Sequence, residues 1–329
     1  MVYLVVWSFI VAAGLMSACG VAAHALLPAV GIRSWAILQS LAALTLVALG
    51  RYGLFENMMK VLIGLMTATL LLSVVMVGID PGSLLRGLIP SFPKGSAAAA
   101  LSLMGGVGGS VTLLAYGYWI REKGWRGSGA ISMVRIDLTV GSFLTGLFGV
   151  AMLLLSAAVL GGGGGMPPGS EALVACGDAV REATSARYGA NVGGAVATVF
   201  LVGIWGAVFT STLGVWNGVP YLFADFLNAL RGRYDADVDS RGFAYRGYLF
   251  FLAVPPMVLL FLDRPIWIIK LYTLTGGLFM PVLAGTLLWL NSRRSKVGDL
   301  RNGTVAIATL VLALALFVGI AARQLVDLL

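Results

Sequence analysis

Hydroxyl-bearing side chains occur in three short clusters inside otherwise apolar stretches of the chain. Hydroxyl and carbonyl oxygens can replace the water around a cation, or they can hold a small polar solute. The sequence therefore predicts an oxygen-lined site where three segments meet at a similar depth. The clusters are Ser110 and Thr112; Thr210, Ser211 and Thr212; and Tyr272, Thr273 and Thr275.

The first cluster follows the glycine-rich stretch "MGGVGG", which ends with Gly108 and Gly109. Glycines weaken a helix and leave its backbone carbonyl and amide groups accessible. A helix broken in this way at mid-membrane depth is a common way to build a solute site in a transporter. Close helix packing through small residues is the alternative. The second cluster favours the broken helix, because three adjacent hydroxyls at 210–212 exceed what we expect one helix to absorb.

The elements that carry these clusters must be membrane helices. The 329 residues are 59% hydrophobic and only 11% charged, and their mean hydropathy of +0.94 is too high for one soluble core. Backbone groups in hydrocarbon must hydrogen-bond within their own segment, so we predict an all-α integral membrane protein. Nine spans are expected, at about 2–27, 32–50, 54–78, 98–120, 131–160, 190–216, 244–262, 265–291 and 304–323. Residues 161–189 should form an external spacer on the membrane surface that contains a short helix.

Basic residues indicate how the chain is oriented. Of the 22 Lys and Arg residues, fourteen fall in one set of alternate loops and adjoining helix ends, and eight fall in the other set. Since cytoplasmic loops are enriched in Lys and Arg, we expect Met1 to be cytoplasmic in a multi-pass protein of the plasma or inner membrane. The basic excess thus indicates topology, and no nucleic-acid partner is expected.

Few titratable groups lie within the apolar segments. Asp137 begins the fifth span, where an unpaired charge would cost about 2.5–3.5 kcal/mol at the bilayer centre. It should pair with Arg126 or Arg135, or else belong to a proton or ion route, and both interpretations stay open. His24, the single histidine, is expected to hydrogen-bond near a helix end.

Three longer stretches resemble the NRAMP divalent-metal transporters: "GRYGLFENMMKVLIGLMTATLL", "LMGGVGGSVTLLAYGYWIREKGW" and "WGAVFTSTLGVWNGVPYLFADFL". The resemblance implies one transmembrane domain over residues 1–329, with a divergent LeuT-like inverted-repeat fold. Residues 1–78 would be the remainder of the first repeat, 98–291 the second repeat, and 304–323 an extra C-terminal helix. The family's first two helices would then be missing before Met1, and we expect the 329-residue chain alone not to transport.

The same resemblance implies a set of ligands. Gly108, Gly109 and Ser110 stand where the best-known members carry a methionine ligand, and Thr273 stands at a glutamine position of the family. Substrate would contact these residues and Thr112, with Ser110 and Thr273 as metal ligands. Without the methionine sulfur, the remaining oxygens favour a hard ion such as Mg2+ or Mn2+. The run at 210–212 and Asp137 are candidates for an ion or coupling site.

The function predicted from these features is secondary transport of a divalent metal cation of the Mn, Mg or Fe class, with proton coupling as an open element. The alternative is a sodium-coupled symporter for a small organic solute, in which residues 210–212 hold the sodium ion. An enzyme is not expected, because no histidine cluster, intramembrane carboxylate pair or nucleotide loop occurs. No cofactor is expected; the metal ion is the substrate, and membrane lipid surrounds the protein.

Overall fold

Helices form nearly all of the described chain. The computed structural model describes residues 1–49, 52–78, 110–160, 171–234 and 237–328, together with residues 82, 100 and 103. Seven helical segments in these residues are long and apolar enough to span a membrane. They are α1 (Val2–Leu26), α2 (Ile32–Leu49), α3 (Tyr52–Val77), α7 (Ile131–Leu160), α9 (Ala190–Leu230), α10 (Phe243–Ala253) continued by η3 (Pro255–Leu262), and α11 (Pro265–Asn291). The prediction of an all-α multi-pass membrane protein is confirmed.

Shorter or more polar elements complete the described chain. A further helix, α13 (Thr304–Leu328), has its apolar part at Thr304–Ile320. The remaining elements are η1 (Ser110–Ala115), α6 (Tyr116–Glu122), η2 (Ser128–Ala130), α8 (Glu171–Tyr188), α12 (Arg294–Val297) and η4 (Gly298–Leu300).

The predicted fourth and sixth spans compare differently with the structure. Residues 98, 99, 101, 102 and 104–109 of the fourth span lie outside the described residues, and its second half is a 3-10 helix, η1, that continues into α6. The sixth span was expected to end at residue 216, but α9 continues to Leu230 through Pro220. Asp225 therefore lies within this helix.

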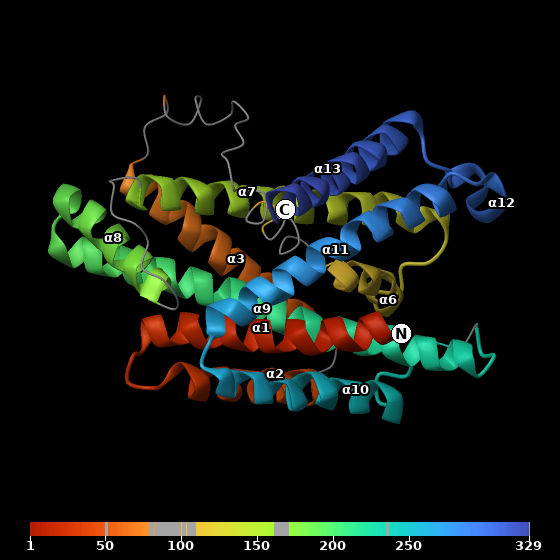
Figure 1. The fold of residues 1–329 in the computed structure, drawn as a ribbon, viewed down its shortest axis with the longest axis horizontal. Helices are drawn as coiled ribbons and strands as arrows, with labels where there is room; N and C mark the ends of the chain where they lie inside the picture. The colour runs from red at the N-terminus through yellow and green to blue at the C-terminus, as the bar shows by residue number, and fades with distance from the viewer. Residues whose placement is uncertain are drawn as a thin grey trace. The chain divides into compact units, whose positions relative to one another are not determined.

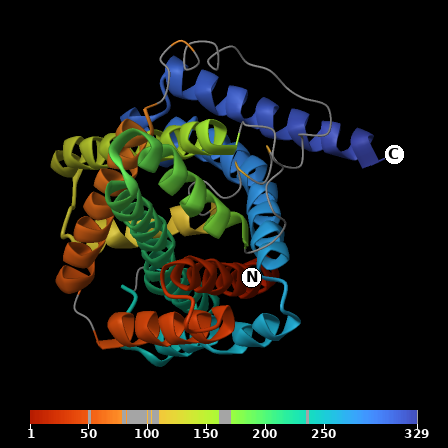
Figure 2. The ribbon, with the colours of Figure 1, turned by 90° about the vertical axis from the view of Figure 1, so that its left-hand side faces the viewer.

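The chain divides into two units, which are described separately. The first consists of Met1–Ile89 and Leu114–Ile269, and the second of Pro90–Leu113 and Lys270–Leu329. In the first unit α9 lies among α1, α2, α3, α8 and α10, and it packs against each of them (Figures 1 and 2). In the second unit Phe317 and Ile320 of α13 pack with Met280 of α11.

Glycines allow close contacts between helices in the first unit. A β-carbon at Gly20 in α1 would lie 2.4 Å from the carbonyl oxygen of Ile32 in α2. A β-carbon at Gly203 in α9 would lie 2.2 Å from Oγ1 of Thr69 in α3. Because real β-carbons do not approach other atoms so closely, these helix pairs depend on glycine at the two crossings.

The short helix expected within 161–189 is present as α8, but it is more than a surface spacer. Gly189, with φ of +91°, lets the chain fold back so that α8 packs along α9. Val180 and Thr184 of α8 are buried, and Val180 shares an apolar core with Leu155 and Phe200. One face of α8 therefore belongs to the core of the first unit.

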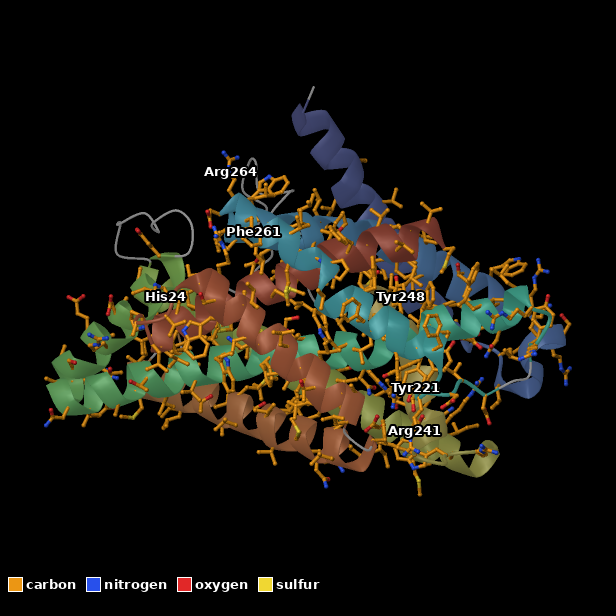
Figure 3. The ribbon with its side chains drawn as sticks, turned by 90° about the horizontal axis from the view of Figure 1, so that it is seen from below. His24, Tyr221, Arg241, Tyr248, Phe261 and Arg264 are labelled. Atoms are coloured by element: carbon orange, nitrogen blue, oxygen red, sulfur yellow. The ribbon has the colours of Figure 1, made fainter. Side chains whose placement is uncertain are left out.

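The first unit has two chemically different ends (Figure 3). At one end the Nδ1 atom of His24 lies 2.8 Å from the Val30 carbonyl oxygen, which confirms the expected role of His24 near a helix end. At the same end Arg33 donates to both carboxylate oxygens of Asp263, at 2.5 and 2.6 Å. The opposite end, here called the basic end, carries Tyr221 and Arg241 (Figure 3). Contacts of neighbouring residues place further basic side chains at this end: Arg121, Lys123, Arg126, Arg231, Arg233 and Arg246.

Candidate metal site and polar network

The residues predicted to bind metal belong to the second unit. Gly108 and Gly109 lie outside the described residues, and Ser110 is described only as the first residue of η1. The Thr112 hydroxyl is buried and has no hydrogen-bond partner among the described residues. Thr273 in α11 is partly exposed, and its hydroxyl donates to the Lys270 carbonyl oxygen of its own helix at 3.0 Å. Thr273 thus retains only oxygen lone pairs for a ligand.

The hydroxyl run in α9 is arranged differently from the sequence expectation. Thr210 and Ser211 both donate to the Ala207 carbonyl oxygen at 2.9 Å, and Thr212 donates to that of Val208 at 3.1 Å. The expectation that one helix could not absorb three adjacent hydroxyls was wrong, because each bonds back to a carbonyl three or four residues earlier. The run also faces in different directions, since Ser211 is exposed whereas its two neighbours are buried.

Asp137 at the start of α7 has partners other than those predicted. Its carboxylate accepts a 2.7 Å hydrogen bond from the Tyr116 hydroxyl, and Lys123 Nζ lies 3.8 Å from its other oxygen. The expected pairing with Arg126 or Arg135 is replaced by pairing with Lys123. The reason is positional: α6 brings Tyr116 and the following Lys123 beside the first turn of α7.

Two more tyrosine–carboxylate pairs tie α6 to α9. The Tyr118 hydroxyl donates to Asp225 at 2.6 Å, and the Tyr221 hydroxyl donates to Glu122 at 2.7 Å. The Tyr118 and Tyr221 rings stack with centroids 5.4 Å apart. With the Tyr116–Asp137 bond, these pairs are called the tyrosine–carboxylate network.

Lys123 and Trp119 extend these contacts. Lys123 Nζ lies 3.3 Å from a Glu56 oxygen, which α3 supplies, and Glu56 also pairs with Lys60 at 2.8 Å. Trp119 donates from its indole nitrogen to the Asn217 side-chain oxygen at 2.7 Å. Seven-residue α6, too short to be stable alone, is therefore held by side-chain contacts to α3, α7 and α9.

A second polar contact that sequence reasoning missed lies in the middle of the first unit. Gln39 of α2 is buried; its amide nitrogen donates to the Cys19 carbonyl oxygen at 3.1 Å, and its amide oxygen accepts from Trp205 at 2.7 Å. The sequence could have indicated this contact, because a single Gln in an apolar span must find hydrogen-bond partners when its amide is buried. Gln39 joins α1, α2 and α9.

Comparison with known proteins assigns the chain to a family. A family model described as natural resistance-associated macrophage protein-like (Nramp) matches residues 1–327. The chain belongs to the Nramp family. Curated proteins give no sequence match. The match to the Nramp model confirms the family predicted from the three quoted stretches. Nramp proteins are membrane transporters of divalent metal ions and not enzymes.

The described part of this Nramp protein holds no group of three or more His, Cys, Asp or Glu side chains placed to bind a metal ion. Cys19 and Cys176 are both free thiols. Hydroxyl and carbonyl oxygens are therefore the candidate ligands among the residues that were predicted to bind substrate.

We expect the Tyr116–Asp137 hydrogen bond to stabilise the attachment of α6 in this Nramp protein. Tyr116→Phe and Asp137→Asn should each lower the free energy of unfolding, with a coupling energy of about 1 kcal/mol in the double variant. Asp137 is 40% exposed, so the value should fall below that of a buried bond to a charged group. Unfolding in mixed micelles measures the cycle. Tyr188 at the exposed end of α8 provides the control, because Tyr188→Phe should show no coupling with Asp137→Asn. A coupling energy equal to that of Tyr116→Phe with Asp137→Asn would contradict the assignment.

Proposed function

We propose that this Nramp protein moves a hard divalent cation, Mn2+ or Mg2+, across the cell membrane by secondary transport. The proposed ligands are Ser110 and Thr273, with the Gly108 and Gly109 carbonyl groups and the Thr112 hydroxyl beside them. Family membership supports a divalent metal over an organic solute.

The observation that carries this assignment is the Thr112 hydroxyl. It is buried in η1, two residues after Ser110, and no described residue hydrogen-bonds to it. A buried polar group without a partner costs about 1–3 kcal/mol, a cost that a ligand bound there would offset. Oxygen ligands of this kind suit ions that prefer oxygen and keep part of their water shell.

Proton coupling through Asp137 is part of the proposal. Asp137 lies at the end of the first unit where Lys123 and Glu56 also meet, so a change in its protonation would alter several contacts of α6. Asp137 is also partly exposed, which gives it access to protons. Thr210–Thr212 remain a candidate ion site only through their oxygen lone pairs, because their hydrogens are engaged.

The proposed orientation places Met1 and the basic end in the cytoplasm of a plasma or inner membrane. Two observations support it. The described basic residues of the α6–α7 and α9–α10 connections lie at one end of the first unit, and His24 lies at the other (Figure 3). Enrichment of Lys and Arg at one end is the expected sign of the cytoplasmic side.

Metal competition and one isosteric variant test the proposal. In proteoliposomes containing the natural gene product, Mg2+ should compete with Mn2+ uptake at least as well as Cd2+, because no sulfur ligand is proposed. Thr112→Val should reduce Mn2+ uptake about tenfold, as expected for losing one oxygen contact to a charged ligand.

Thr198→Val is the matched control, because the exposed Thr198 hydroxyl bonds only to the Gly194 carbonyl oxygen of its own helix. Strong selective inhibition by Cd2+ would refute the oxygen ligand set. Equal uptake by the two threonine variants would remove Thr112 from the site.

A further inference from the structure

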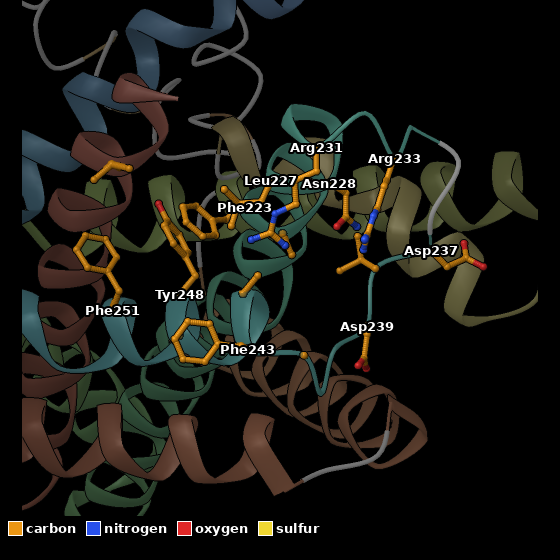
Figure 4. A pocket seen from close by; sticks show the side chains of 16 residues that line it. Phe223, Leu227, Asn228, Arg231, Arg233, Asp237, Asp239, Phe243, Tyr248 and Phe251 are labelled. Carbon is orange, nitrogen blue, oxygen red and sulfur yellow. The ribbon is translucent and has the colours of Figure 1, made fainter.

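A cavity of about 760 Å3 opens at the basic end of the first unit, away from the proposed metal ligands in sequence. Its walls come from the start of α1, the end of α9, the start of α10 and the described part of the connection between α9 and α10 (Figure 4). The volume is that of a site for a small organic molecule.

The inner wall of the cavity is apolar and aromatic. Phe223 and Tyr248 stack with ring centroids 4.2 Å apart, and Tyr248 lies 5.2 Å from Phe251. The Tyr248 hydroxyl is 2.6 Å from Ser8 Oγ, so its polar atom is already engaged. Val5 and Leu227 extend this surface, which therefore favours a hydrocarbon chain.

The outer rim is cationic. Arg231 and Arg233 line the cavity, are exposed, and make no ion pair within the described residues. Two acidic residues also line the cavity, but within the described residues neither forms an ion pair with Arg231 or Arg233. Asp239 accepts from the Arg241 backbone nitrogen at 2.8 Å, and the Asp237 side chain extends away from the arginines (Figure 4). Asn228, beside the arginines, offers an uncharged amide (Figure 4).

A cationic rim next to an aromatic wall, at the basic end of the first unit, fits a molecule with an anionic head and an apolar tail. Two guanidinium groups disfavour a metal cation, and they match a phosphate in charge and geometry. We propose that this cavity binds an anionic phospholipid of the surrounding membrane, with its phosphate on Arg231 and Arg233 and an acyl chain on Phe223, Tyr248 and Phe251. Basic pockets at the cytoplasmic ends of membrane helices recognise such headgroups.

Lipid binding to the purified full chain tests this assignment. Phosphatidylglycerol should stay bound in native mass spectrometry and raise the thermal unfolding midpoint, whereas phosphatidylcholine should do neither. Arg231→Gln combined with Arg233→Gln should weaken phosphatidylglycerol binding about thirtyfold, the effect of losing two basic contacts at a membrane surface.

The matched control is Arg126→Gln combined with Arg246→Gln, which removes the same charge from the basic end outside the cavity. It should leave the affinity nearly unchanged, and equal weakening in both double variants would reduce the proposal to nonspecific charge attraction. Equal binding of phosphatidylcholine would also overturn it.

Phe243→Ser tests the apolar part separately. Phe243 also lines the cavity, where it would contact the acyl chain together with Tyr248 and Phe251. It is 93% exposed, so its replacement leaves the core intact. The variant should weaken binding of phosphatidylglycerol and leave binding of inorganic phosphate unchanged. If inorganic phosphate alone raises the unfolding midpoint as much as the lipid does, or if Phe243→Ser binds the lipid normally, the site does not bind a lipid. This variant also decides the question if the double arginine variant fails to fold.

Discussion

Replacing Ser110 with leucine is expected to abolish Mn2+ uptake while leaving the amount of folded protein in the membrane unchanged. Leucine removes the proposed hydroxyl ligand and places a branched apolar side chain beside Gly108 and Gly109, where the ion would lose part of its water shell. Uptake into proteoliposomes that contain the natural gene product, normalised to inserted protein, measures the effect.

Thr309→Leu is the control for this variant. Thr309 in α13 is exposed, and its hydroxyl donates to the Val305 carbonyl oxygen of its own helix, so uptake should be retained. Normal uptake by Ser110→Leu would contradict the site and return the glycines at 105–109 to a role in helix packing.

Gly20→Ala should have the largest effect on stability. The new methyl group would lie 2.4 Å from the Ile32 carbonyl oxygen, and a backbone atom cannot move aside as the end of a side chain can. We expect α1 and α2 to be forced apart at a cost of about 1–3 kcal/mol. The fall in unfolding midpoint of the purified protein measures it.

Gly64→Ala is the matched control, because Gly64 also lies in a membrane helix and a β-carbon there would meet no atom within 4 Å. Alanine favours helix over glycine by about 1 kcal/mol, so this variant should be as stable as the natural protein or slightly more stable. An unchanged midpoint in Gly20→Ala would mean that the two helices can separate at little cost.

Helix positions could be predicted from the sequence because lipid leaves the backbone few alternatives. The first span was expected at 2–27 and is found at Val2–Leu26; the eighth was expected at 265–291 and is found at Pro265–Asn291. In both, apolar residues run without interruption between polar or proline boundaries, so the local sequence contains the needed information.

The end of α9 could not be predicted in the same way. Asn217, Pro220 and Asp225 look locally like the end of a span, yet the helix runs through them. Trp119 and Tyr245 hydrogen-bond to Asn217, and Tyr118 hydrogen-bonds to Asp225. These partners lie 28 to 107 residues away in the chain, beyond the reach of a local pattern.

The candidate site was predicted only in part for a similar reason. The sequence identified hydroxyl clusters, but it could not show that Thr210 and Ser211 both bond to Ala207 whereas the Thr112 hydroxyl has no partner among the described residues. It showed that Asp137 needs a partner, but it did not identify Tyr116 as the hydrogen-bond donor. The ligand roles of Gly108, Gly109 and Ser110 stay predictions.

The tyrosine–carboxylate network has a consequence for how α6 can move. Its three bonds start from one rigid short helix and end on two different partners, α7 and α9, so a displacement that stretches one of them stretches the others too. A small shift would break several bonds to charged groups without forming new ones. Each intact bond is worth about 1–3 kcal/mol, the partly exposed Tyr116–Asp137 bond being at the low end. Intermediate positions of α6 would then be hardly populated. Its departure would be a cooperative switch between two discrete states, with waiting times on the order of microseconds to milliseconds between events.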